Sequence, residues 1–223
     1  MNPGRRRADR ARDGSGAAPG GAGRTGPAGA TRGIRLARAV TELTAPAVLV
    51  SVLTVVVAWH GARGGVDGLA WGLLATVFVS GIPFAYIVGG VRRGRLTDHH
   101  VGVREQRRVP LLFGLGSVAA GLPLLAVLGA PRPVLGLAAA GLVGLVIAVS
   151  VSHWWKMSIH SAVAAGAVVV LVLTFGTRML VTAPLPALVG WSRVRLRDHT
   201  VPQVVAGGAL GALVAGLVYG TLG

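Results

Sequence analysis

The sequence predicts an all-α membrane protein, a polytopic helical bundle with six or seven transmembrane helices. Hydrophobic residues make up 52% of the 223 residues and the mean hydropathy is +0.67, yet the formal net charge is +15. Soluble globular domains rarely combine so apolar a composition with so much charge. A membrane protein does, because apolar residues fill the spans while basic residues gather in the loops. The charge therefore requires no nucleic-acid partner, and none is expected.

The N-terminal segment, residues 1–40, is expected to be a disordered cytoplasmic tail rich in Gly, Ala and Arg, and residues 41–223 are expected to form the transmembrane domain. Up to about residue 33 the chain has almost no large apolar side chains, so it cannot bury a core. The arginines of the tail are able to attract anionic lipid headgroups, at about 1 kcal/mol per charge near the surface. A solvated tail is the simpler expectation.

Seven apolar runs follow the tail, and each is a candidate span. They cover residues 44–59, 68–91, 111–129, 134–152, 161–176, 181–191 and 201–222. A span needs about 17 to 25 residues, so the sixth run, which is short and contains two prolines, is expected to be tilted, broken or partly re-entrant. In the last run Gly207 with Gly211, and Gly216 with Gly220, place small residues one turn apart. Such pairs allow another helix to approach closely, and we expect packing inside the bundle rather than dimerisation.

The distribution of basic residues predicts the orientation. With seven spans, 13 Lys and Arg residues of the loops and the adjoining tail fall on one side of the membrane, and three fall on the other. The positive-inside rule then places the N-terminus and the charged loops in the cytoplasm of a multi-pass protein of the cell membrane. The chain has no cysteine, which excludes disulfides, thiolate nucleophiles and cysteine metal sites.

Three charged segments, 92–108, 153–160 and 192–203, are separated by pairs of apolar runs, so all three are expected at one membrane face. They hold five of the six histidines, which are His99, His100, His153, His160 and His199. Arginine and lysine bind phosphoryl oxygens, and a neutral imidazole can attack phosphorus or protonate a leaving oxygen. The cluster therefore indicates a phosphate site that needs no metal and no other cofactor.

These segments resemble the three signatures of the PAP2 superfamily, the type 2 phosphatidic acid phosphatases and haloperoxidases. Residues 192–199, SRVRLRDH, fit the third signature, which is SR, five residues and then H. Residues 156–160, KMSIH, are similar to the second signature, PSGH, with Ser and His retained. Residues 104–110, REQRRVP, resemble the end of the first signature, K with six residues and then RP. The resemblance covers the chain from about residue 99 to its end, in the family's order.

The resemblance implies that His199 is the nucleophile that forms a phosphohistidine and that His160 protonates the leaving alcohol. The family usually has an aspartate four residues after the nucleophile, and here that catalytic position is occupied by Gln203. Glutamine can accept the imidazole proton and fix the tautomer, but it supplies no charge. In the serine-protease triad an analogous amide substitution costs about 10⁴ in rate. Asp198 is expected to lie on another helix face and not to replace the family aspartate fully.

Phosphate binding is assigned by the same resemblance to side chains from all three segments. They are Arg193, Ser158, Arg104, Arg107 and Arg108. Lys156 stands next to the second signature and is a further candidate for phosphate binding, but its extension toward the headgroups, beside two tryptophans, is the simpler expectation. The lysine of the first signature is missing, and His100 can serve there, while Ile159 adds bulk where glycine is usual. Asp98 and the two histidines after it are metal-ligand types, but adjacent side chains diverge, so no metal site is expected.

The leading interpretation is a metal-independent phosphatase of a lipid phosphate or diphosphate, with its site at the cytoplasmic headgroup level and reached sideways from the bilayer. A UbiA-type prenyltransferase is superficially similar in the loop after the second span, but its two aspartate-rich motifs are absent. A catalytically silent relative that binds anionic lipids or a membrane partner is the third reading, and Gln203 is its main support. The sequence favours no oligomeric state.

Overall fold

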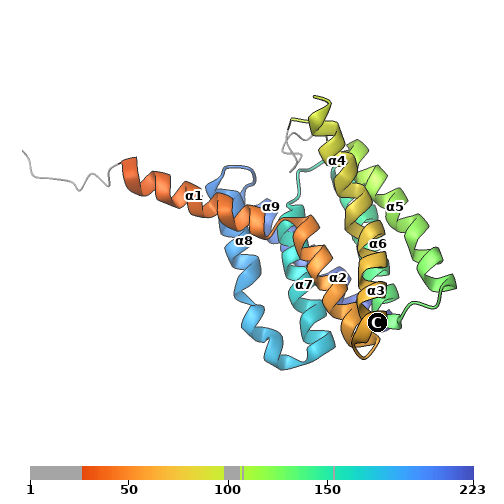
Figure 1. Cartoon of the computed structure of the whole chain (residues 1–223). Helices are drawn as coiled ribbons and strands as arrows, with labels where there is room; N and C mark the ends of the chain where they lie inside the picture. Colours follow the sequence, from red (N-terminus) through yellow and green to blue (C-terminus); the bar gives the residue numbers. More distant parts are fainter. Residues whose placement is uncertain (1–26, 98–105, 107, 153) are drawn as a thin grey trace, which may run out of the picture.

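The computed structural model describes residues 27–97, 106, 108–152 and 154–223, and within these ranges the chain forms helices and turns but no strand (Figure 1). The elements are α1 Pro27–Leu43, α2 Pro46–Gly61, α3 Gly65–Thr76, η1 Val77–Gly81, α4 Ile82–Arg92, α5 Arg108–Val127, α6 Arg132–Ser152, α7 Ile159–Phe175, η3 Thr177–Thr182, α8 Pro184–Arg195, α9 Val201–Val214, η4 Ala215–Tyr219 and α10 Gly220–Leu222. η1 and η4 are π-helical turns inside longer helices, and η3 is a 3₁₀ helix.

The prediction of an all-helical membrane protein is confirmed, but the count of six or seven spans is not. Four helices are long and apolar enough to cross a membrane, namely Gly65–Arg92, Arg108–Val127, Arg132–Ser152 and Val201–Leu222. The pair formed by α1 and α2 gives a fifth candidate if it is counted as one span, although it is bent by 43°. α7 is apolar but has 17 residues, and α8 has only 12. The described part of the chain thus supports four or five spans.

The sixth apolar run is broken, as its prolines suggested. Its residues are divided between η3 and α8, and α8 begins at Pro184. Proline is well tolerated in the first turn of a helix but cannot continue the hydrogen bonding of a preceding one. The outcome is a short helix whose last turn carries Arg193.

Helix α1 covers residues 27–40, which the sequence analysis had assigned to the disordered tail; residues 1–26 lie outside the described residues. The helix has a buried side formed by Ala37, Val40 and Thr41, and an exposed side rich in arginine. The buried side packs against α8. The helix forms despite its polar composition because burial of that one side against α8 stabilises it. Part of the expected tail, residues 27–40, is therefore helical.

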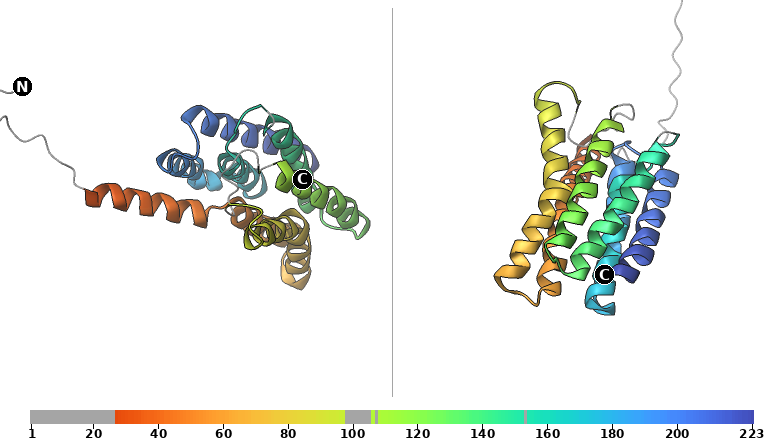
Figure 2. Two further views of the ribbon diagram at one scale, coloured as in Figure 1. Left: turned by 90° about the horizontal axis from the view of Figure 1, so that it is seen from above. Right: turned by 90° about the vertical axis from the view of Figure 1, so that its right-hand side faces the viewer.

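The helices alternate in direction, and this brings the described parts of the charged segments to one end of the bundle. Figure 1 shows the ends of α4, α6 and α8 and the starts of α5, α7 and α9 at that end, with α1 running across it. From above, α1 extends away from the bundle (Figure 2). The expectation that the three segments share one face agrees with this arrangement for the residues that the structure describes.

The closest packing in the bundle is between α7 and α9, where two glycines allow backbone contact. A Cβ atom added at Gly207 would collide with the carbonyl oxygen of Ser158, and one added at Gly211 with that of Ala162. Packing inside the bundle, the role expected of this pair, is confirmed. A Cβ at Gly216, by contrast, would meet nothing within 4 Å. The close contact holds α9 against the start of α7.

Candidate active site

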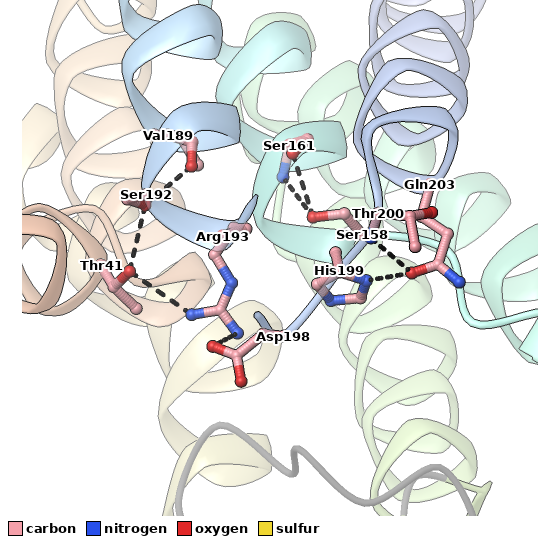
Figure 3. A network of polar contacts seen from close by, with 10 residues as sticks. All are labelled: Thr41, Ser158, Ser161, Val189, Ser192, Arg193, Asp198, His199, Thr200 and Gln203. Carbon is pink, nitrogen blue, oxygen red and sulfur yellow. Dashed lines mark hydrogen bonds and ion pairs between the residues drawn. The ribbon is translucent and has the colours of Figure 1, made fainter. Parts of the chain in front are cut away.

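The third signature lies on the last turn of α8 and the turn that leads into α9. The side chain of Arg193 is only 2% exposed, and its Nη2 atom forms an ion pair with Oδ2 of Asp198 at 3.0 Å (Figure 3). The backbone N–H groups of Asp198 and His199 donate to the carbonyl oxygen of Arg193 at 3.1 and 3.3 Å. Arg197, with a φ of 60°, supplies the left-handed residue of this turn. The result is a buried guanidinium with a fixed orientation.

Thr41 completes the surroundings of this arginine, although no local sequence pattern marks it as a site residue. Arg193 Nη1 donates to Thr41 Oγ1 at 3.4 Å, Thr41 Oγ1 lies 3.1 Å from Ser192 Oγ, and Ser192 Oγ donates to the carbonyl of Val189 at 2.7 Å. Guanidinium only donates, and the Ser192 proton is engaged by Val189, so the Thr41 hydroxyl must donate to Ser192. The hydrogen bonds therefore run in one direction, from Arg193 through both hydroxyls to Val189.

His199 is 5% exposed, and Gln203 holds its ring. Gln203 Oε1 lies 3.2 Å from His199 Nδ1 and accepts a hydrogen bond from the backbone N–H of Thr200 at 3.1 Å. The N–H of Thr200 can only donate, so the side-chain atom that faces it must be the amide oxygen and not the nitrogen. An oxygen at this place requires the proton on Nδ1, which leaves the lone pair on Nε2. Gln203 thus selects the tautomer in which Nε2 can act as a nucleophile.

The same glutamine starts helix α9 and joins it to α7. Thr200 and Gln203 form a reciprocal capping box at the beginning of α9. The carbonyl oxygen of Gln203 accepts a hydrogen bond from the N–H of Ser158 at 3.2 Å. Ser158, which is fully buried, is the N-cap of α7, and its Oγ accepts from the N–H of Ser161 at 3.4 Å. The second and third signatures are therefore connected through one residue.

The structure brings together His199, Gln203, Arg193 and Ser158, and it places the other expected residues less closely. His160 is 5% exposed in the first turn of α7 and lines a large cavity inside the bundle. Of the remaining expected phosphate ligands, Lys156 is half-buried before α7 and Arg108 is exposed at the start of α5. Arg104 and Arg107 lie outside the described residues. The same holds for the other polar residues of the charged segments that were named above, which are Asp98, His99, His100 and His153. In the part of the chain that the structure describes, no group of three His, Asp or Glu side chains is placed to hold a metal ion.

Asp198 contacts the arginine. Its ion pair with Arg193 is the interaction described above, and its side chain is 37% exposed. A buried guanidinium without a partner is energetically costly, and the carboxylate of Asp198 compensates the charge of Arg193. An anion entering the site would meet a cation that is already oriented, and would compete with a carboxylate that water can reach.

The chain matches the family model of the PAP2 superfamily over residues 109–222. No curated protein and no solved structure matches it. The matched segment begins at the start of α5 and includes Ser158, His160, Arg193, His199 and Gln203, whereas Thr41 precedes it. A PAP2 domain indicates a phosphatase-type function. Because the match covers more than half of the chain, the protein belongs to the PAP2 superfamily.

Proposed function

We propose that the protein hydrolyses the phosphate or diphosphate ester of a membrane lipid through a phosphohistidine on His199. The observation that carries the proposal is the hydrogen bond between His199 Nδ1 and Gln203 Oε1 at 3.2 Å, beside the buried Arg193. In the first step Nε2 of His199 attacks phosphorus, the bond to the lipid oxygen breaks, and His160 gives that oxygen a proton. In the second step His160 takes a proton from water, and the resulting hydroxide displaces the histidine and releases phosphate.

Arg193 is proposed as the main phosphate ligand. Its guanidinium is held by Asp198 at 3.0 Å and by Thr41 at 3.4 Å, so it needs little reorganisation when charge builds up on the phosphoryl oxygens. Ser158 would contribute a hydrogen bond, and further charge would come from the other basic residues of the charged segments, which are Lys156, Arg104, Arg107 and Arg108. No step in this scheme uses a metal ion or another cofactor.

The lipid character of the substrate is supported by the position of the site in a membrane bundle. His199 lies just before Val201–Leu222, a helix long and apolar enough to cross a membrane, and Arg193 is in the last turn of α8, which packs against that helix. A phosphate at headgroup level would reach that end while its hydrocarbon part stayed among the helices. We place this end at the cytoplasmic side of the cell membrane, because most basic loop residues lie there by sequence.

The proposal is tested by phosphate release from detergent-purified protein in the presence of chelator. The substrates are phosphatidic acid, phosphatidylglycerophosphate, and polyprenyl phosphates and diphosphates. His199→Ala should abolish release, whereas His60→Ala, at an exposed histidine near the other end of the bundle, should retain it. Trapping of a labelled phosphoryl group on wild-type protein, with an acid-labile bond, would identify the intermediate. Release that persists in His199→Ala would contradict the mechanism.

A catalytically silent relative is the second candidate, and one observation favours it. Gln203 brings no negative charge to the imidazole, so a positive charge that forms on His199 is not compensated there. Such a protein would still bind phosphorylated lipids through Arg193. Binding of the substrate panel by folded wild-type protein without any release would favour this candidate over the first.

A further inference from the structure

A cavity of about 350 Å³ lies inside the bundle, and its walls are almost entirely apolar. Its volume is within the range of about 300–1,000 Å³ that is typical of ligand pockets. Of its described lining residues, three have polar side chains: Thr54, Ser80 and His160. The hydroxyls of Thr54 and Ser80 donate to backbone carbonyls at 2.7 and 3.0 Å, so they present no donor to the cavity. A hydrocarbon is the ligand class that suits such walls.

The cavity is elongated along helix α6, and one end of it lies at the second signature, next to Ser158. One end is bordered by Met157 and His160 at the start of α7, and α6 lines it from Ala148 back to Val134, near the opposite end of the bundle. At about 1.5 Å per residue, the stretch from Val134 to Ala148 is about 21 Å long. One leaflet of the hydrocarbon core is only about 15 Å thick. The cavity is therefore longer than one leaflet is deep.

The width of the cavity depends on glycines of α6. Gly141 and Gly144 both line it, and a Cβ atom added at either position would meet nothing within 4 Å. These residues lie one turn apart on the side of α6 that also presents Leu137 and Ala148 to the cavity. A larger side chain at either glycine would project into the open space rather than into a neighbouring helix.

We propose that this cavity binds one hydrocarbon chain of the phosphorylated lipid, and that Gly141 and Gly144 determine how long and how wide that chain can be. The inference rests on the proposed function, because it places the phosphate at Arg193 and His199. His160 is the junction: it borders the cavity, and the proposed mechanism has it protonate the oxygen that joins phosphate to chain. The substrate would be a lipid phosphate with a chain longer than one leaflet.

The test compares substrates that differ only in chain length. Gly141→Leu and Gly144→Leu replace helical glycines with a better helix former, so the helix itself is not weakened. The matched control is Gly216→Leu, at an exposed glycine that is outside the cavity lining and whose added Cβ would also meet nothing within 4 Å. Each variant is assayed with a series of single-chain alkyl phosphates of increasing length and with a short water-soluble phosphate ester.

The expected result is that the ratio of kcat/KM for the longest chain to that for the soluble ester falls at least tenfold in both cavity variants and stays within twofold in Gly216→Leu. The preferred chain length should become shorter. Equal losses on both substrates, or no change in the ratio, would overturn the inference and leave the phosphatase proposal intact.

Direct binding separates this inference from the proposed function. Equilibrium binding of a labelled long-chain alkyl phosphate to the purified variants is measured without turnover. The dissociation constant should rise at least tenfold in Gly144→Leu and remain unchanged in Gly216→Leu. If wild-type protein releases no phosphate but this difference is found, the phosphatase proposal fails and the chain site stands. If binding is the same in all variants, the chain site is refuted whatever the activity.

Discussion

The two sides of α7 use glycine in opposite ways. Toward α9, Gly207 and Gly211 bring the two backbones into contact, and the hydrogen bond from Ser158 to Gln203 is formed there. Toward α6, Gly141 and Gly144 border open space. The packed side fixes the groups that would act on phosphorus, and the open side leaves room for an apolar chain. Glycine therefore allows close helix packing between α7 and α9, and it leaves space for a cavity beside α6.

The largest effect is expected when the packed side is forced apart. Gly207→Leu places a side chain against the carbonyl oxygen of Ser158, which belongs to backbone and cannot move aside. Overpacking of a tight core costs about 1–3 kcal/mol or more, and here it would also separate Gln203 from α7. We expect a lower melting temperature in detergent and loss of release from every substrate.

Gly144→Leu is the comparison for that variant, because it adds the same side chain on the open side. It should retain the wild-type melting temperature and lose activity selectively on long chains. If both variants are equally destabilised, the distinction between a packed and an open side is wrong.

A smaller effect, of opposite sign, is expected when charge is added to the packed side without changing its shape. Gln203→Glu keeps the length of the side chain, and Glu is the usual partner in a capping box. It supplies the negative charge that Gln203 lacks, so kcat should rise at least about tenfold. This is a fraction of the roughly 10⁴-fold loss of rate that an amide in place of the aspartate causes in a serine-protease triad.

The control is Gln203→Met, which has similar length but no acceptor, and which should lower kcat below that of the wild type. Steady-state kinetics of folded protein measures both. A kcat for Gln203→Glu at or below the wild-type value would mean that the charge of this residue does not limit the reaction.

The smallest effect is expected away from both sides of α7, where α1 meets α8. Thr41→Val removes the hydroxyl that accepts from Arg193 and donates to Ser192. The loss of one such hydrogen bond, worth about 1 kcal/mol, corresponds to about fivefold weaker binding of phosphate to Arg193. The inhibition constant of inorganic phosphate and KM should rise together, with kcat little changed.

Thr41→Ser retains the hydroxyl and should behave like wild-type protein. A loss in Thr41→Ser as large as that in Thr41→Val would contradict the prediction, because Thr41→Ser keeps the hydroxyl to which the effect is attributed.

The sequence was most informative where function depends on local spacing. The spacing of Arg193, His199 and Gln203 is set within one short segment, the turn between α8 and α9 and its two flanks. The structure places these side chains close together. The common location of the charged segments followed from counting apolar runs. The number of spans did not, because hydropathy cannot show that α1 and α2 meet at a 43° bend.

Features that depend on tertiary packing could not be predicted. Thr41 and Ser192 are separated by 151 residues, and nothing local to either one names the other. The spacing of Ala37, Val40 and Thr41 fits a helix with one buried side, but the arginines around these residues mask the pattern. Gly144 and Gly207 look alike in sequence, since only the neighbouring helix decides whether a glycine is a contact or an opening.

The oxygen of Gln203 has one further consequence. It accepts from the Thr200 N–H that starts α9 and from the ring of His199, so the winding of that first helical turn and the protonation pattern of the imidazole are a single equilibrium. If the first turn of α9 frays, Gln203 no longer fixes the tautomer of the ring. In the proposed mechanism, the fraction of molecules ready to attack phosphorus is therefore limited by the fraction whose α9 is fully wound.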